Sequence, residues 1–183
     1  MSHAHVRDAN LVAALALALV DGVHDAVAQA GVQQGSGAAA LTALHGPAAG
    51  ASIDVLRRIV GLTHSGAVRL VDRLAAAGLV ERRLGADQRS VALWLTPSGR
   101  RAARRLLARR EAAVETALAP LTAAERAALV HATEKVLAGL AAEPDAERRV
   151  CRLCDTEACG RSRGRCPVQA AVASQAVNVN PLP

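Results

Sequence analysis

Four cysteines lie close together near the end of this 183-residue chain. They belong to the stretch CRLCDTEACGRSRGRC, with the spacing C-x2-C-x4-C-x6-C, and are Cys151, Cys154, Cys159 and Cys166. In a cytosolic protein such a cluster indicates metal or redox chemistry rather than a framework of structural disulfides. Four thiolates form a closed tetrahedral zinc site, and a C-x2-C pair is typical of one half of that site.

The second half of the cluster leaves the cofactor open. Its spacing is looser than in a usual zinc knuckle, and Pro167 directly follows the last cysteine. A closing Cys-Pro is typical of small iron–sulfur loops. We therefore predict zinc as the cofactor, with an iron–sulfur cluster and metal-free thiols as the alternatives. The residues that follow, 169–183, are predicted to be disordered.

A second candidate site is a cationic helix in the middle of the chain, within GLTHSGAVRLVDRLAAAGLVERR (61–83). It begins with the small polar residues Thr63 and Ser65, which would let the helix start approach base edges and phosphates closely. Its outward face carries Arg69 and Arg73, four residues apart. The inward face is predicted to consist of Val68, Val71 and Leu74. An ordinary solvated helix is the alternative reading of the arginines alone.

The segments on either side of this helix favour DNA over a plain surface. A short helix over residues 53–60 precedes it across a glycine turn, and the two form a helix-turn-helix. The cationic helix is predicted to end at Gly78, a residue suited to the left-handed C-terminal position. Two strand-like segments follow at 79–84 and 90–95, joined by the five-residue loop GADQR. A helix-turn-helix with a hairpin is a winged helix-turn-helix.

Longer helices flank this unit. The first, over about residues 8–30, is apolar on nearly all sides, which predicts burial on more than one face, as in a subunit interface. Two more are expected over residues 97–119 and from about 123 to 141. Hydroxyl side chains are expected to cap four of the helices: Ser52, Thr63, Thr96 and Thr122.

Composition narrows the function. The formal net charge is +6, but residues 51–110 hold thirteen basic and four acidic side chains, a local net charge of +9. A basic patch of this kind indicates a polyanionic partner. The chain has one Trp and no Tyr or Phe, which argues against single-stranded nucleic acid, whose bases stack on aromatic rings. We find no phosphate-binding loop and no catalytic motif, so we predict that the protein is not an enzyme.

The apolar run LVAALALALV (11–20) could be mistaken for a targeting segment. Charged residues stand close to it on both sides, Asp8 before it and Asp21 after it, and ten residues are too few to cross a bilayer. We therefore predict a buried helix in a cytoplasmic protein that has no membrane partner.

Three motifs in order resemble the MarR family of transcriptional regulators. They are LTHSGAVRLVDRLAAAGLVERR (62–83), DQR (87–89) and LTPSG (95–99). Family members are similar to L-[ST]-x-S-x-x-x-R-L-V-D-R-L-x-x-x-G-L-V-x-R, followed by a wing with D-x-R and then L-T-x-x-G. The resemblance covers about residues 8–142. Positions 67 and 68 depart from it, since they read Ala-Val where many members have an apolar residue followed by Thr.

The resemblance implies a homodimer that binds double-stranded DNA, most often as a repressor, and that a small-molecule effector can release. By position, the residues facing the major groove would be Thr63, His64, Ser65 and Arg69. Arg89 in the wing would enter the minor groove. Asp87 would steady the wing by pairing with an arginine such as Arg73.

The expected fold class is mainly α with a small β-wing, a winged helix-turn-helix with N- and C-terminal dimerisation helices. Residues 1–34 and 97–142 would form the dimerisation helices, residues 35–96 the DNA-binding lobe, and residues 143–183 a linker and cysteine tail. Two other functions remain open at this point. The cysteine tail could be the sensor of a metal- or redox-responsive regulator, or the helix-turn-helix could be the remnant of a protein-interaction module.

Overall fold

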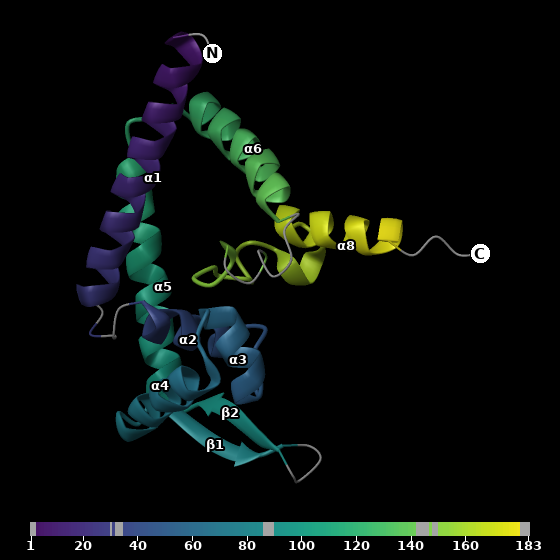
Figure 1. Ribbon diagram of the computed structural model, residues 1–183. Coiled ribbons are helices and arrows are strands. Elements are labelled where there is room, and N and C mark those ends of the chain that lie inside the picture. The colour runs from purple at the N-terminus through teal and green to yellow at the C-terminus, as the bar shows by residue number, and fades with distance from the viewer. Residues whose placement is uncertain are drawn as a thin grey trace.

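The computed structural model describes residues 3–29, 31, 35–85, 90–141, 147 and 150–179. In chain order, the helices and strands are α1 (His3–Gln29), α2 (Ser36–His45), α3 (Ile53–Val60), α4 (His64–Ala76), β1 (Val80–Leu84), β2 (Val91–Leu95), α5 (Pro97–Leu118), α6 (Ala123–Leu140), the 3-10 turn η1 (Arg161–Arg163) and α8 (Pro167–Val179). The predicted fold class, mainly α with a two-stranded wing, is confirmed (Figure 1).

The predicted helix caps are all present. The Thr63 hydroxyl accepts a hydrogen bond from the Gly66 N–H at 3.2 Å and so satisfies a free donor in the first turn of α4. Equivalent bonds begin α3, α5 and α6, where the capping residues are Ser52, Thr96 and Thr122. These interactions lie within four residues of chain, so the local sequence is enough to specify where each of these helices begins.

We define the lobe as residues 36–95 together with the N-terminal half of α5. One aliphatic core holds the lobe together. Each of its five main elements contributes a leucine with essentially no exposed surface, and these are Leu41, Leu56, Leu70, Leu93 and Leu106. Burying a leucine side chain stabilises a fold by about 2 kcal/mol. Because these side chains come from α2, α3, α4, β2 and α5, the helix-turn-helix, the wing and α5 share a single core.

The wing is an antiparallel hairpin. Its strands pair from Val80 opposite Leu95 to Leu84 opposite Val91. They begin one residue later than predicted. A backbone hydrogen bond of 2.9 Å from the Gly50 N–H to the Leu93 carbonyl attaches the segment before α3 to the other edge of β2.

A tight corner joins the end of α4 to the start of α5. The Thr96 hydroxyl donates to the Gly78 carbonyl at 2.6 Å, and the Thr96 N–H donates to the Leu79 carbonyl at 3.1 Å. Gly78 has a φ of +67°, as predicted for the residue that ends α4. Gly99 lies so close to Leu79 that an added Cβ would come within 1.9 Å of the Leu79 carbonyl oxygen.

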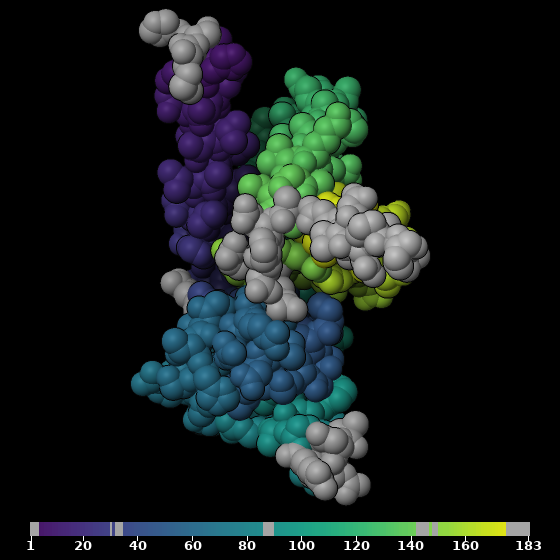
Figure 2. All heavy atoms as spheres, turned by 45° about the vertical axis from the view of Figure 1, so that its right-hand side comes forward, coloured from purple at the N-terminus to yellow at the C-terminus, as the bar shows by residue number. Residues whose placement is uncertain are grey.

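The helices α1 and α5 run side by side away from the lobe, and α6 returns from the far end of α5 (Figure 1). Only the end of α1 is buried, at Ala26 and Val27. Most of the remaining helix is exposed, with Val12 and Leu17 each 67% accessible. In Figure 2, α1 and α6 project from the lobe, and the wing lies at the opposite end. The burial predicted for α1 is therefore absent from the single chain.

The length of α1 also corrects one argument from the sequence. The apolar run of ten residues is part of a helix whose residues 4–29 are long and apolar enough to cross a membrane, with a mean hydropathy of 1.8. Within the 18-residue stretch that has this hydropathy, only 11% is buried. Its last turns nevertheless pack into the core of the lobe, and its length lies along α5, which are the contacts expected of a helix that packs against protein.

The prediction of disorder after the cysteines is wrong over part of its range. Residues 167–179 form the helix α8, which packs against α6. Pro167 stands at the first helical position, where its fixed φ suits a helix and its missing N–H costs nothing. The segment is rich in alanine, the residue with the highest helix propensity, and Val168, which is 2% exposed, anchors it.

We predict that Gly99→Ala destabilises the lobe by about 3 kcal/mol, because the new methyl group would clash with the Leu79 backbone. Urea denaturation followed by circular dichroism measures the change. Gly139→Ala is the matched control, since a Cβ at Gly139 in α6 has no heavy atom within 4 Å. The control should gain up to about 1 kcal/mol from helix propensity. Equal stabilities of the two variants would contradict the close packing at the corner.

Candidate nucleic-acid interface and cysteine cluster

The helix α4 lies at the surface beside the wing, at the end of the molecule away from α1 and α6 (Figure 1). Its buried face is formed by Ala67, Leu70, Val71 and Leu74. Val68, which was predicted to point inward, is only half-buried. The buried positions recur at intervals of three and four residues, so the helix turns the remaining positions toward solvent.

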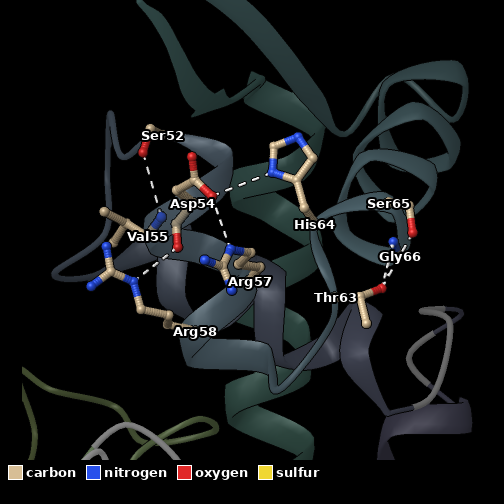
Figure 3. A network of polar contacts seen from close by, with 9 residues as sticks. All are labelled: Ser52, Asp54, Val55, Arg57, Arg58, Thr63, His64, Ser65 and Gly66. Carbon is tan, nitrogen blue, oxygen red and sulfur yellow. Dashed lines mark hydrogen bonds and ion pairs between the residues drawn. The ribbon is translucent and has the colours of Figure 1, made fainter.

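The residues predicted to face the major groove all lie on this exposed side. Thr63, His64, Ser65 and Arg69 are exposed. The Thr63 and Ser65 hydroxyls stand 3.4 Å apart at the start of α4 (Figure 3). The N-terminus of a helix carries partial positive charge and free N–H groups, which favour a phosphate.

Asp54 links the two helices of the helix-turn-helix (Figure 3). Its carboxylate accepts a hydrogen bond from Arg57 Nε at 2.8 Å within α3, and it lies 3.3 Å from Nδ1 of His64 at the start of α4. The Arg57 hydrogen bond, followed by that of His64, lowers the pKa of Asp54 below its ordinary value. The carboxylate is therefore charged at neutral pH.

The two helix arginines differ in their surroundings. Arg69 is exposed and, among the described residues, has no hydrogen bond or ion pair. Arg73 is exposed as well but already takes part in an interaction. Asp87 and Arg89, the predicted wing residues, lie outside the described residues, so their expected pairing and groove contact stay predictions.

Charged side chains also attach the wing to α4. Arg82 Nη2 in β1 donates to Asp72 Oδ1 in α4 at 2.6 Å. Next to it, Arg83 pairs with Glu81 and lies over the ring of Trp94, 5.5 Å from the ring centroid. These contacts orient basic side chains along the hairpin, and the cation–ring geometry is within the range that gives attraction.

The structure brings the four cysteines to one cavity, and we call them the thiol cluster: Cys151, Cys154, Cys159 and Cys166. The cavity measures about 210 Å³, and Arg110 of α5 and Leu137 of α6 contribute to its wall. Cys166 is buried, the other three thiols are half-buried, and none of them is in a disulfide. Among the described residues, no three His, Cys, Asp or Glu side chains form a group that could hold a metal ion as they stand.

Burial changes the acidity of two of these thiols. It raises the pKa of Cys151 to about 11, with further contributions from the neighbouring Cys154 and Cys166. Burial and the same two neighbours raise the pKa of Cys159 to about 12. Both thiols are therefore protonated at neutral pH. A protonated thiol is a poor nucleophile, so Cys151 and Cys159 do not resemble reactive cysteines.

Comparison with known proteins agrees with this geometry. Residues 38–90, from α2 into the wing loop, match the family model described as MarR family. Over these residues the chain is similar to the MarR family of winged helix-turn-helix regulators. Regulators of the MarR family bind DNA and are not enzymes, as predicted for this chain. A search of curated proteins found no match.

Solved MarR-family structures have the same fold. A MarR family protein from Bacillus stearothermophilus superposes with a TM-score of 0.65 at 20% identity, over 74% of this chain and 95% of that one. A Mycobacterium tuberculosis MarR family protein, solved in complex with p-aminosalicylic acid, gives a TM-score of 0.54 at 28% identity, over 70% and 96% of the two chains. About a quarter of this chain thus has no counterpart in either structure, a share similar to that of the residues after α6.

The sequence analysis did not predict the polar contacts that Asp54 and Asp72 make in this lobe. The spacing of Asp54 and Arg57 is a recognisable helical pair, and that signal was available. The contact of Asp54 with His64, ten residues away, and that of Asp72 with Arg82 depend on how the helices and the wing fold together.

Proposed function

We propose that the protein is a homodimeric repressor that binds double-stranded DNA through α4 and the wing and is released by a small-molecule effector. Each dimer would present two lobes to a pseudo-palindromic operator, with half-sites roughly 10 bp apart. A dimer seated on promoter DNA blocks transcription by occupying the site. We infer a cytoplasmic location, where such a regulator meets its DNA.

One observation carries the DNA-binding assignment. The capped start of α4 is exposed, and Arg69 stands one turn further along the same helix with no protein partner among the described residues. An exposed, unpaired guanidinium beside a helix N-terminus is suited to phosphates and to the acceptor atoms of guanine. The local net charge of +9 over residues 51–110 adds a general attraction to the DNA backbone.

We predict that Arg69→Ala weakens operator binding tenfold or more, equivalent to about 1.4 kcal/mol. If Arg69 contacts a phosphate, the slope of log affinity against log salt concentration should also fall by about 0.9. Fluorescence anisotropy with labelled duplex from beside the protein's own gene measures both quantities.

Arg109→Ala is the matched control for this experiment, because Arg109 is an exposed arginine on α5, distant from α4. It should leave affinity and salt slope nearly unchanged. Equal losses of operator affinity in the two variants would mean that α4 is only one part of a general basic surface. No salt-dependent binding by the wild-type protein would instead support a protein-interaction module.

The apolar surface of α1 supports the dimer. Besides Val12 and Leu17, it exposes Val6, Leu11, Leu15 and Val20, and α6 exposes Val130, Val136 and Leu140. A helix with apolar side chains around most of its circumference is stable in water only when a partner covers it. A second copy of the chain, bringing its own α1 and α6, would supply a surface of the same chemistry.

We predict that Leu17→Glu converts the dimer into monomers, because a carboxylate would be buried in an apolar interface. Analytical ultracentrifugation measures the mass. Leu84→Glu is the matched control, since Leu84 is a similarly exposed leucine (75%) that lies on the wing. A wild-type monomer, or a Leu17→Glu dimer, would contradict the assignment. Recovery of the wild-type chain only with membranes would favour a membrane role for α1.

An effector site is supported by a second cavity of about 210 Å³, between the lobe and the residues after α6. Ala48, Val55 and Ile59 line it on the apolar side, and Arg161 stands among its polar residues. Thr42 Oγ1 on its wall is buried and, in the described structure, has no hydrogen-bond partner. An unsatisfied buried hydroxyl costs about 1–3 kcal/mol, which the polar group of a ligand could recover.

We predict that a small aromatic acid such as salicylate lowers operator affinity, since one similar MarR family protein, from Mycobacterium tuberculosis, has been solved both with salicylic acid and with p-aminosalicylic acid. Thr42→Val should reduce the response to salicylate several-fold while leaving DNA binding without ligand intact. Thr133→Val on the distant helix α6 is the control. Competition anisotropy measures the effect, and an unchanged response in Thr42→Val would remove this cavity from the proposal.

A further inference from the structure

The thiol cluster lies in a segment that has very little hydrophobic core. The buried side chains there are Ala141, Cys166 and Val168, and the residues packed around them include Cys151 and Cys159. A segment shorter than about 40 residues rarely buries enough apolar surface to fold alone, and it is usually stabilised by disulfides, a metal or a partner. All four thiols are free, and Cys166 belongs to this small core with Cys151 and Cys159 packed against it.

The backbone between the cysteines is folded into successive turns. The Asp155 carboxylate accepts hydrogen bonds from the N–H groups of Glu157 and Ala158, each at 3.0 Å. Gly160 and Gly164 both adopt a left-handed conformation, with φ of +73° and +67°. These turns bring the chain from the first pair of cysteines back to Cys166, so that distant positions in the sequence reach one cavity.

The donor set selects the chemistry. The cavity wall offers four sulfur donors and no histidine or carboxylate, and soft thiolates suit zinc or an iron–sulfur cluster rather than magnesium or calcium. Zinc with four thiolates carries a net charge of −2. Arg110 on the wall of the cavity, and Arg161 close to Cys151, would offset that charge.

We propose that Cys151, Cys154, Cys159 and Cys166 bind one zinc ion as a four-thiolate site that stabilises the fold of this tail. Because no three of these side chains stand as a finished ligand set, loading requires the thiols to rotate toward the centre of the cavity. Each bound thiol releases its proton to solvent as the zinc–sulfur bond forms. The site is structural, since a closed set of four sulfur ligands leaves no position for a substrate.

The tail is docked on the DNA-binding lobe, which gives the zinc site a route to DNA binding. Leu153, between the first two cysteines, packs against the core of the lobe. The Thr156 hydroxyl lies against Gly46 at the end of α2, where an added Cβ would come within 2.9 Å of it. Loss of the metal would therefore loosen a segment that contacts the helix-turn-helix.

The test uses the full-length protein, purified under reducing conditions from cells supplied with both zinc and iron. We expect elemental analysis to find one zinc per chain, and Cys154→Ser and Cys159→Ser to lose most of it. Glu157→Gln is the control, because it removes a neighbouring acidic side chain and should keep the zinc. Bound iron with acid-labile sulfide would overturn the zinc assignment, as would four free thiols with no metal.

A second measurement applies if the serine variants do not fold. Zinc is removed from the wild-type protein with a chelator, and cobalt(II) is added in its place. The intense visible bands of tetrahedral cobalt thiolate should appear at one equivalent, with recovery of the thermal transition of the tail. Absence of those bands would overturn the proposal. Operator binding in the same samples is a separate readout, so failure of the zinc site and failure of the DNA-binding function are distinguishable.

Discussion

The corner between α4 and α5 is the contact on which the other parts of the molecule depend. Two hydrogen bonds from Thr96 reach the backbone at Gly78 and Leu79, and Gly99 lies directly against the Leu79 carbonyl. Gly99 has no room for a side chain at this contact, and the start of α5 has little room to slide along the end of α4. The helix that would enter DNA is thereby attached to the long helix that runs to the proposed dimer interface, and a tilt of α5 must move α4.

The shared leucine core extends this coupling through the lobe. The fully buried leucines of α2, α3, α4, β2 and α5 contact a common centre, and close-packed cores transmit displacement rather than absorb it. The effector cavity proposed above touches α2 and α3, and the tail rests on the same two elements. The proposed ligand, the tail and the proposed dimer helices would therefore act on one rigid body, and DNA affinity is the property that all of them would change.

Acidic residues determine which arginines remain available to DNA. Asp54 holds Arg57, and Asp72 holds Arg82, whereas Arg69 has no such partner among the described residues. The lowered pKa of Asp54 means that its contribution to stability is present above the ordinary aspartate pKa and is lost as pH falls through the lowered value. The carboxylate is exposed, so water and salt screen this contribution.

The sequence alone determined the features that depend on short-range contacts. The hydroxyl caps, the glycine that ends α4, the hairpin and the order of the elements follow from interactions within a few residues, and the structure confirms them. The family resemblance places Thr63, Ser65 and Arg69 in one continuous motif, and all three are exposed, while their contact with DNA stays a prediction.

Tertiary structure decided what depends on distant neighbours. The packing of α8 against α6 includes the burial of Val168, and the link from Asp54 to His64 rests on the angle between two helices. The sequence shows four cysteines but not that they share one cavity with Arg110 of α5. Local hydrogen bonds can be read from spacing, whereas packing between segments far apart in the chain exists only once the chain has closed on itself.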